Sequence, residues 1–474
     1  MGQGLGSALG AVRGEGPGCR AAAEAREADR RLREDARAHP PRRAAGRGRL
    51  APDGDDAIKL PAGLAPFRSR NFALYWVGQT TSNVGTWVEL TATSWLLYQL
   101  TDSPLLLGLG GLARGLPIVL LAVVGGAVAD RVPRRRLLLV TQSLMVVASL
   151  VLGTLVVTGA VQFWHIYLIS LTTATVMAFD VPARTAMFPT LVPRHQMQHA
   201  VALSSMIFRL STFIGPAISG VLIALYGIGV PFFVNAASYF AIIFGLLLMR
   251  LPPTQARAPS SLRADALSGL RYARHHAILP LILMTEACLS IFGANQALYT
   301  IFARDVLDVG ATGLGFMLSS VGFGAILGAS TLIAVGNIRQ KGRVMIGAGT
   351  LYAGAIVAFA WSRSLPLTLA ILFVLGYADA LWGAMRGTIA QLATADAYRG
   401  RVMSLLTIVT RGLTQFSHVE TGAAVSLLGP TFAAALGGGM VAAVVVTLLT
   451  RVQRLRDFRS DGRAVPVEEL AAAD

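Results

Sequence analysis

Three ionisable residues lie inside long apolar stretches of the sequence and are candidates to carry a proton across a membrane. Glu89 and Arg114 occupy consecutive apolar runs, and Glu286 lies in a later one. A charged side chain costs about 2.5–3.5 kcal/mol at the centre of a membrane span unless it is paired or hydrated. At ~1.5 Å per residue, Glu89 and Arg114 reach similar depths of ~25 Å and ~24 Å along their helices. We therefore expect that protonation of Glu89 releases Arg114, or that the two form a static ion pair. Glu286 is a second candidate proton carrier, a polar part of a cavity wall or a charge that attracts cations.

Polar side chains recur at helical spacing around both glutamates. One stripe accompanies Glu89, a second follows Glu286, and a third ends at His418. A polar stripe on an apolar helix turns towards the protein interior in a membrane, so we expect the stripes to line a shared cavity. The residues assigned to this cavity are Gln79, Asn83, Thr86, Ser290, Gln296, Arg411, Gln415 and His418. A histidine titrates in the range that proton coupling needs, but a hydrogen bond to a neighbouring helix is the simpler interpretation of His418.

Two further pairs of opposite charges lie near the ends of apolar runs. Asp180 and Arg184 are four positions apart, and Asp379 and Arg386 share one helix face two turns apart. Ion pairs at helix ends are a common structural device. In a transporter the same charges could close a cytoplasmic gate, so both interpretations stay open.

These residues must be positioned by membrane-spanning helices, as the composition indicates. Of 474 residues, 54% are hydrophobic and 14% are charged, whereas a soluble protein has about 25% charged residues. The apolar residues form runs of about twenty, the length that crosses a bilayer as a helix. We predict an all-α polytopic membrane protein of about twelve helices in two six-helix halves. The expected helices span residues 72–99, 104–128, 137–157, 163–181, 200–226, 230–250, 278–303, 312–335, 344–361, 365–386, 401–428 and 430–452.

Basic residues gather in alternate connections between these runs, which predicts that both termini are cytoplasmic. This distribution accounts for the formal charge of +16 without a nucleic-acid partner. The N-terminal segment has no apolar stretch long enough for a signal peptide. The expected organisation is a disordered cytoplasmic tail at 1–66, a six-helix half at 67–250, a cytoplasmic linker at 251–277, a second six-helix half at 278–452 and a cytoplasmic tail at 453–474.

An internal repeat relates the two predicted halves. A shift of 202 positions superposes Arg184 on Arg386 and Gly220 on Gly422. A shift of 205 positions superposes the Gly-Leu-Gly sequence at 108–110 on the same sequence at 313–315. Transporters built from two repeats bind their substrate between the repeats, near the midplane of the bilayer.

A short motif follows the second apolar run and resembles a loop of the major facilitator superfamily. Its residues are Gly126, Asp130, Arg131, Arg134 and Arg135. Small residues let two helices approach closely, Asp130 can cap a helix or pair with an arginine, and the arginines anchor the loop at the cytoplasmic face. A generic basic loop is the alternative. The matching loop of the second half lacks the Asp-Arg pair.

A second motif, with Gly215, Pro216 and Gly220, resembles the antiporter motif of the same superfamily. Ser219 stands where that motif has a glycine. A proline among small residues gives a kinked helix that can move against a partner, which suits a gate. An ordinary packing face is the alternative.

A wider resemblance runs from Phe67 to about Arg451. It rests on the sequences at 71–72, 78–79, 85–87, 100–104 and 399–404. These segments look like the exporter branch of the major facilitator superfamily, which holds enterobactin exporters and macrolide and multidrug efflux proteins. The resemblance implies secondary active export driven by proton entry.

The expected function is therefore proton-coupled export of a small, moderately hydrophobic molecule such as a drug-like compound or a siderophore. Solute uptake on the same fold and a transport-inactive receptor or assembly component are the alternatives. Neither Lys59 nor Lys341 lies in a phosphate-binding loop, so the chain itself does not use ATP. We expect no enzyme activity, cofactor or metal, and a monomer in the cytoplasmic (inner) membrane of a bacterium, with the lipid bilayer, protons and the cargo as partners.

Overall fold

The computed structural model of the chain describes residues 62–249, 270–276 and 278–451. The predicted tails before residue 62 and after residue 451, and most of the predicted linker, lie outside the described residues. Residues 62–66, which the sequence assigned to the tail, belong to a 3₁₀ helix, η1 (Ala62–Arg68). The Phe67 ring of η1 packs edge-on against Phe72 and Trp76, which fixes η1 beside the first long helix.

The described part of the chain is helical, without strands. The first half comprises α2 (Arg70–Thr101), α3 (Pro104–Arg131), α4 (Arg134–Val157), α5 (Phe163–Met187), the short η2 (Phe188–Thr190) and η3 (Arg194–Gln196), α6 (Met197–Tyr226) and α7 (Val230–Leu248). The second half comprises α9 (Leu279–Phe292), α10 (Gln296–Ile301), η4 (Phe302–Val306), α11 (Gly310–Val335), α12 (Lys341–Trp361), α13 (Leu365–Ala393), α14 (Asp396–Leu428) and α15 (Pro430–Arg451).

These helices confirm the predicted all-α fold of about twelve spans in two halves. Ten spans in the described residues are long and apolar enough to cross a membrane, with α9, α10 and η4 together counted as one. The helices α2 and α14 are as long as the others, but they contain more polar residues and are therefore not among the ten apolar spans. Both helices contribute to the cavity described below, which explains why they are the more polar spans.

The seventh span is broken, which the sequence did not predict. The helix α9 ends at Phe292, and α10 begins at Gln296 after an extended segment. Asn295 caps α10, because its Oδ1 accepts a hydrogen bond from the Leu298 amide at 3.2 Å. Its Nδ2 donates to Ser417 Oγ and Thr421 Oγ1 of α14, both at 2.7 Å. The Asn295 side chain therefore satisfies one of the backbone amides freed by the break and ties the break to a neighbouring helix.

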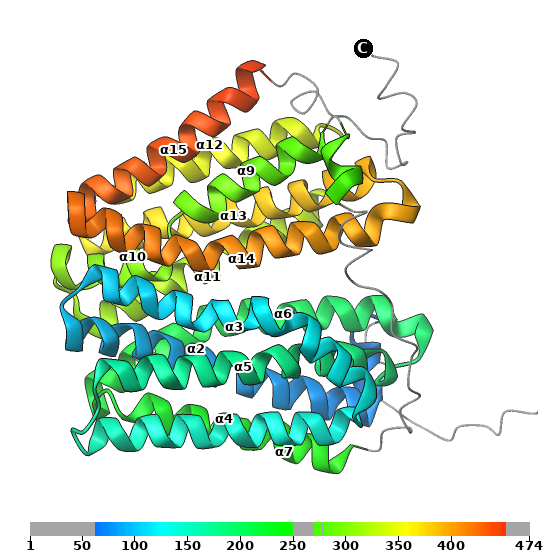
Figure 1. Cartoon of the computed structure of the whole chain (residues 1–474). Coiled ribbons are helices and arrows are strands. Elements are labelled where there is room, and N and C mark those ends of the chain that lie inside the picture. The colour runs from blue at the N-terminus through cyan, green and yellow to red at the C-terminus, as the bar shows by residue number, and fades with distance from the viewer. Residues whose placement is uncertain (1–61, 250–269, 277, 452–474) are drawn as a thin grey trace, which may run out of the picture. The chain divides into compact units, whose positions relative to one another are not determined.

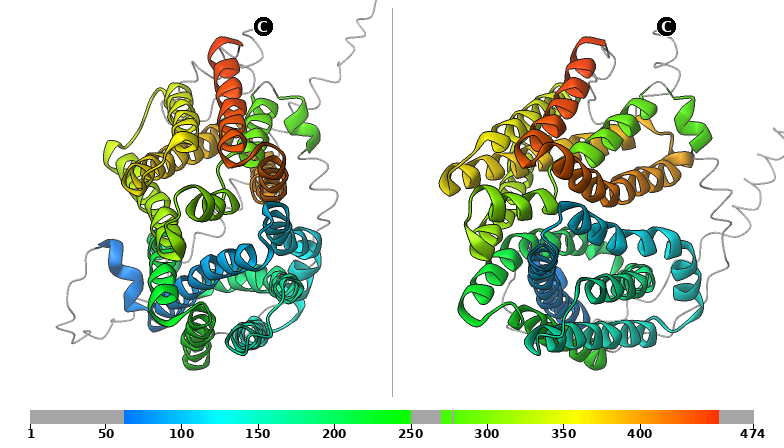
Figure 2. Two further views of the ribbon diagram at one scale, coloured as in Figure 1. Left: turned by 90° about the vertical axis from the view of Figure 1, so that its left-hand side faces the viewer. Right: turned by 60° about the vertical axis from the view of Figure 1, so that its left-hand side comes forward.

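The two halves lie one above the other, and their helices run alternately between two ends of the bundle (Figure 1). We call the end that carries the links 132–133, 188–196, 336–340 and 394–395 the basic end. The far end carries the links 102–103, 158–162, 227–229, 307–309 and 362–364. Seen from the far end, residues 62–249 and 278–451 form two groups of helices viewed almost end-on (Figure 2).

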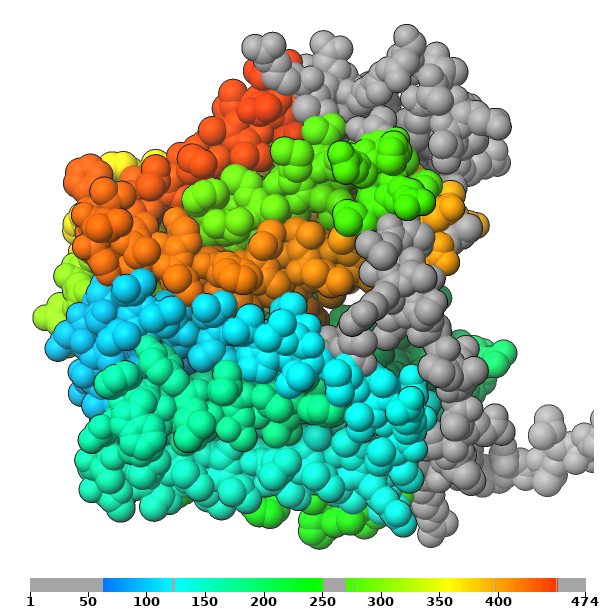
Figure 3. Space-filling model, viewed as in Figure 1, coloured from blue at the N-terminus to red at the C-terminus, as the bar shows by residue number. Residues whose placement is uncertain are grey.

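Two glycine-rich seams join the halves: α6 packs on α11, and α14 packs on α3. The surfaces of α14 and α3 meet along one side of the boundary (Figure 3). A β-carbon at Gly220 of α6 would lie 2.9 Å from the carbonyl oxygen of Ala311. At Gly422 of α14, it would lie against the carbonyl oxygen of Pro104. These two glycines are related by the repeat of 202 positions, so the repeat corresponds to two equivalent seams.

We expect the substitution Gly422→Leu to force the α3–α14 seam apart near the far end. Overpacking a tight interface costs about 1–3 kcal/mol, so the purified protein should melt at a lower temperature in detergent. The matched control is Gly347→Leu on α12, because nothing lies within 4 Å of a β-carbon at Gly347. Equal melting temperatures for the two variants would show that the seam does not need a glycine.

Candidate functional site

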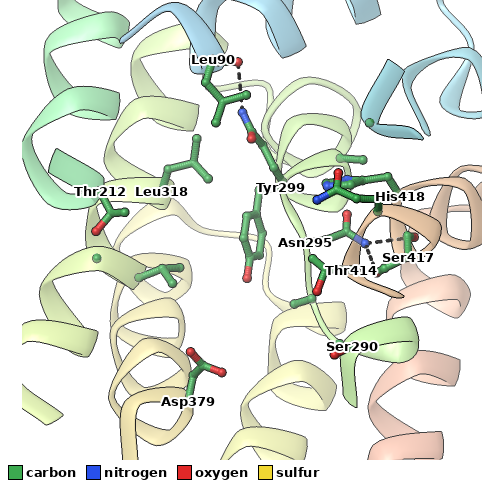
Figure 4. A pocket seen from close by; sticks show the side chains of 18 of the residues that line it. Leu90, Thr212, Ser290, Asn295, Tyr299, Leu318, Asp379, Thr414, Ser417 and His418 are labelled. Carbon is green, nitrogen blue, oxygen red and sulfur yellow. Dashed lines mark hydrogen bonds between the residues drawn. The ribbon is translucent and has the colours of Figure 1, made fainter. Parts of the chain in front are cut away.

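A cavity of about 960 Å³ lies between the two halves. Its walls come from α2, α3, α5 and α6 of the first half and from α9 to α14 of the second. Its polar and charged side chains include Arg114, Arg209, Asn295, Asp379 and His418. Tyr299 stands in the middle of the cavity, with Asp379 below its hydroxyl group and His418, Asn295 and Ser417 on the other side (Figure 4). A membrane cavity of this size, lined by both apolar and polar side chains, is suited to a partly hydrophobic small molecule.

Polar contacts between α2 and the broken seventh span close the cavity at the far end. Gln296 Nε2 donates to the Leu90 carbonyl at 3.2 Å and to Ser94 Oγ at 3.0 Å. One turn further, Thr300 Oγ1 donates to Ser94 Oγ at 3.4 Å. These contacts tie α10 to the first half, and the one to the Leu90 carbonyl is drawn in Figure 4.

A second group of contacts lies beyond them, and we call its residues the far-end latch: Tyr98, Asp102, Arg304 and Asp305. Arg304 forms an ion pair with Asp102 and donates to the Tyr98 carbonyl at 2.7 Å. Its guanidinium also lies 5.0 Å from the centre of the Tyr98 ring. The Tyr98 hydroxyl donates to the Asp305 carboxylate. The latch joins the end of α2 to η4, and the sequence did not predict it because Arg304 and Asp102 are 202 positions apart.

The structure places four of the eight predicted cavity residues in the cavity wall: Ser290, Gln296, Gln415 and His418. The other four, Gln79, Asn83, Thr86 and Arg411, do not line it. Arg411 is exposed and forms no polar contact in the described part of the chain. It adjoins the wall residue Thr410 in sequence, but successive residues of a helix point about 100° apart.

The three excluded residues of α2 lie where α7 covers that helix. Gly78 packs against Ile242, and a β-carbon on Gly85 would collide with the Ser238 side chain. The Thr86 hydroxyl lies 3.4 Å from the hydroxyl of Tyr239, also on α7. The polar stripe of α2 therefore faces the interior of the first half at this level. The cavity wall of α2 is formed by the following turns, at Trp87, Leu90, Thr93, Ser94 and Leu97.

Glu89 belongs to a hydrogen-bond network within the first half. Its Oε2 accepts a hydrogen bond from Ser149 Oγ of α4 at 2.5 Å and from Asn235 Nδ2 of α7 at 2.6 Å. The expected direct ion pair with Arg114 is not formed among the described residues. Arg114 lines the cavity and forms no hydrogen bond or ion pair with a described side chain, although its charge and that of Glu89 are close enough to act on each other.

Glu286 is tied into the second half from three sides. It is buried and forms an ion pair with Arg386 of α13. Its Oε1 accepts a hydrogen bond from Thr410 Oγ1 of α14 at 2.9 Å, and the Trp382 indole donates to its Oε2 at 3.4 Å. A buried carboxylate with this many partners joins α9, α13 and α14, so its contacts favour a structural role over proton transfer.

The predicted pair of Asp379 and Arg386 is wrong. Two turns of one helix separate the residues by about 10 Å along the axis, and Arg386 pairs with Glu286 on α9 instead. Asp379 faces the cavity and forms no hydrogen bond or ion pair with a described residue. Sequence spacing alone could not reveal that another helix supplies the partner of Arg386.

The second gate candidate, Asp180 with Arg184, forms the predicted ion pair inside the first half. Asp180 is buried, and its Oδ1 also accepts hydrogen bonds from Thr141 Oγ1 and Gln142 Nε2 of α4, both at 2.8 Å. These contacts join α4 to α5 and do not reach the second half. The geometry therefore supports the structural interpretation of this pair.

The loop motif anchors the basic end of the first half. Arg134 donates to the Ala186 carbonyl at 2.6 Å, and Arg135 donates to the Leu247 carbonyl at 2.7 Å. Asp130 and Arg131 are exposed, and Asp130 has neither a helix terminus nor an arginine as partner among the described residues. The close approach predicted for Gly126 belongs to its neighbour Gly125, which packs against the Ala178 carbonyl of α5, whereas the space at Gly126 is open.

The α6 motif packs against two helices at once. A β-carbon at Gly215 would lie 2.5 Å from Cβ of Trp87 on α2, and the carbonyl of Pro216 faces Gly315 on α11. Ser219 Oγ donates to the Val88 carbonyl at 2.8 Å. The helix α6 therefore contacts the helices that flank the cavity in both halves, with Gly220 in the seam to α11.

No cluster of histidine, cysteine, aspartate and glutamate that could hold a metal ion occurs within residues 62–249, 270–276 and 278–451.

Comparisons with solved structures support the fold seen here. A transporter of the POT family in complex with a thioalcohol-conjugated peptide aligns with a TM-score of 0.65 at 11% identity, over 81% of this chain and 96% of that one. A bacterial homologue of the lysosomal transporter Spinster, inward-facing and unoccupied, aligns with a TM-score of 0.62 at 15% identity, over 84% and 99% of the two chains. At these identities the likeness shows the shared fold.

Sequence comparisons identify the family. Residues 61–472 match the family described as transmembrane secretion effector. The enterobactin exporter EntS of Shigella boydii serotype 4 (strain Sb227) is 26% identical over 367 residues, which cover 77% of this chain and 87% of that exporter. YfiS of Bacillus subtilis (strain 168), an MFS-type transporter, is 27% identical over 354 residues, 70% of this chain and 81% of that protein. The chain therefore belongs to the transmembrane secretion effector family of major facilitator transporters, which confirms the resemblance of its sequence motifs and makes it a transporter rather than an enzyme.

Proposed function

We propose that this protein exports a small, moderately hydrophobic molecule, such as a drug-like compound or a siderophore, by proton antiport with alternating access. The proposal rests on one observation above all, the cavity of about 960 Å³ between two halves that are joined across it at the far end. The relatives named as enterobactin exporters support export as the direction.

Alternating access requires that the halves can separate at one end while they close at the other. In this conformation the far-end latch and the contacts of Gln296 hold that end closed. The α3–α14 seam loosens towards the basic end, where a β-carbon at Gly412 would only approach Val119 to 3.9 Å. We assign the basic end to the cytoplasm of a bacterial inner membrane, with both termini on that side, because arginines concentrate in its links and on the adjoining ends of α3, α4 and α14. The cavity then takes up cargo from the cytoplasm.

Proton coupling is assigned to Glu89 with Arg114 as its partner. Arg114 has no partner in the cavity wall, and Glu89 is held by two neutral donors, Ser149 and Asn235. A guanidinium without a partner in a membrane cavity gains several kcal/mol by pairing with a carboxylate. In the proposed cycle, Glu89 pairs with Arg114 in one conformation and takes up a proton in the other.

The proposed function is tested by the accumulation of labelled drugs and siderophores in cells with and without the protein. We expect expression to lower accumulation, and a proton uncoupler to abolish the difference. Accumulation that rises on expression would instead establish uptake. No change with any compound would favour a transport-inactive receptor or assembly component.

The substitution Glu89→Gln should separate proton coupling from cargo movement. In proteoliposomes we expect this variant to exchange labelled for unlabelled cargo but to lose accumulation driven by a proton gradient, because glutamine cannot carry the proton. Glu420→Gln is the matched control, since Glu420 lies on α14 outside the main cavity. Gradient-driven accumulation by Glu89→Gln at the wild-type rate would refute this assignment.

A further inference from the structure

Asp379 is the described carboxylate of the cavity wall that has no bonded partner. It projects into the cavity from α13, and its side chain is exposed to that space. Glu286, the other carboxylate in the wall, is neutralised by Arg386. An ionised carboxylate within a membrane span is costly unless a cation compensates it. A bound molecule that carries a positive charge would therefore be stabilised beside Asp379.

Two tyrosines near Asp379 make this part of the cavity suitable for binding a cation. Tyr299 of α10 points its hydroxyl end towards Asp379 (Figure 4). Tyr352 of α12 also lines the cavity, and its hydroxyl lies against Gly293 in the break of the seventh span. The charge of Asp379 acts on both phenols. An organic ammonium ion is attracted by the faces of aromatic rings and by the opposite charge of a carboxylate.

The remaining charges of the cavity lie on its other wall. Arg114 of α3 and Arg209 of α6 both come from the first half, and Arg209 donates to the Ala325 carbonyl at 3.1 Å. Arg209 is the cation whose charge acts on Asp379, but the two form no ion pair among the described residues. The cavity is thus polarised, with its uncompensated negative charge on the wall of the second half.

Resting on the proposed export function, we propose that Asp379, with Tyr299 and Tyr352, binds the cationic end of the cargo, so that the cargo class is lipophilic molecules carrying an amine or another organic cation. The cation neutralises the charge of the Asp379 carboxylate. The apolar body of the cargo occupies the rest of the cavity and contacts Leu318 and Leu375 of the same half. A cargo held at α13 is then placed opposite the arginines of the first half.

Binding to purified protein tests this subsite without requiring transport. The probes are labelled tetraphenylphosphonium and tetraphenylborate, which have nearly the same shape and opposite charge. We expect the wild type to bind the phosphonium, and Asp379→Asn to weaken that binding at least tenfold. Glu420→Gln, which changes a carboxylate outside this cavity, should bind as the wild type does. Melting curves establish that each variant is folded.

A ring substitution adds a second, independent readout. Tyr299→Phe keeps the aromatic face and should retain phosphonium binding within about threefold, whereas Tyr299→Leu should lose more, as expected for a contact between a cation and an aromatic ring. Unchanged phosphonium binding by Asp379→Asn, or no phosphonium binding by folded wild type, would overturn the proposal. Tetraphenylborate could instead bind more tightly than the phosphonium, with an affinity that Asp379→Asn does not change. That result would show that the charged end of the cargo binds at the arginines. Failure of export in cells with intact phosphonium binding would refute the proposed function and leave the subsite standing.

Discussion

The substitution Arg386→Met is expected to lower the free energy of unfolding by about 3–5 kcal/mol, because it leaves the Glu286 carboxylate buried without its cation. Glu286 is 4% exposed, so little water reaches its carboxylate to replace the lost partner. The same carboxylate also holds α14 through Thr410, so the packing of three helices depends on the pair. Thermal melting of the purified protein in detergent, followed by the loss of monodisperse protein, measures the effect.

A double variant distinguishes the effect of leaving one charge unpaired from the effect of changing the packing of these side chains. Glu286→Gln combined with Arg386→Met removes both charges, and we expect it to be more stable than Arg386→Met alone, as found for other buried ion pairs that are removed together. The single change Arg399→Met is the control, because Arg399 pairs with Asp396 at 2.5 Å on a more exposed surface. A melting temperature of Arg386→Met equal to that of Arg399→Met would contradict the structural role assigned to Glu286.

The substitution Arg304→Ala is expected to shift the protein towards a conformation open at the far end. It removes the ion pair with Asp102, the hydrogen bond to the Tyr98 carbonyl and the contact with the Tyr98 ring. The ion pair alone contributes little, since the Asp102 side chain is 73% exposed. Together the three contacts should contribute about 1–2 kcal/mol, which shifts a two-state equilibrium about five- to thirtyfold.

The reaction of a cysteine with a water-soluble maleimide measures this shift. The reporter is Ser94→Cys, because Ser94 lies beneath the latch and contacts Gln296. We expect it to react at least fivefold faster in the Arg304→Ala background. Arg363→Ala is the control, since Arg363 lies at the same end but donates to Thr431 within the second half. Equal rates in the two backgrounds would show that the latch does not hold the cavity closed.

The number and order of the helices could be predicted from the sequence because a bilayer imposes a simple rule of length and polarity on each span. The repeat of 202 positions also anticipated a structural relation, since Gly220 and Gly422 occupy equivalent places in the two seams. The break before Asn295 was not predictable from apolar runs. It depends on hydrogen bonds to Ser417 and Thr421, residues more than a hundred positions away.

The candidate site was predictable only in part. A polar stripe indicates that one face of a helix turns towards the protein interior. It does not indicate whether that face lines the cavity between the halves or packs against a helix of the same half. The stripes of the seventh and eleventh spans reach the cavity at Gln296 and Gln415. The stripe of α2 is covered by α7 at Thr86, although the same helix lines the cavity a turn later at Leu90. Helix crossing angles decide such differences, and a single sequence does not contain them.

Charged residues were harder to assign than polar ones, because their partners come from other helices. Spacing along one helix grouped Arg386 with Asp379. In the structure Arg386 pairs with Glu286 of another helix, and Asp379 faces the cavity. The loop motif of the first half anchors the basic end, but the far-end latch and the broken span make contacts with both halves. The contacts at the far end are therefore shared between the halves, while the loop motif belongs to the first half alone.

We propose that the two halves open and close alternately around the cavity. Paired spin labels test this motion most directly. In a variant without Cys19 and Cys288, labels at Thr158 and Ser364 report on the far end, and labels at His195 and Asn337 report on the basic end. We predict that a change of pH from 8 to 5.5, or the addition of a transported cargo, changes the two distances in opposite directions in nanodiscs. Distances that stay constant under every condition, or that lengthen together, would contradict the account.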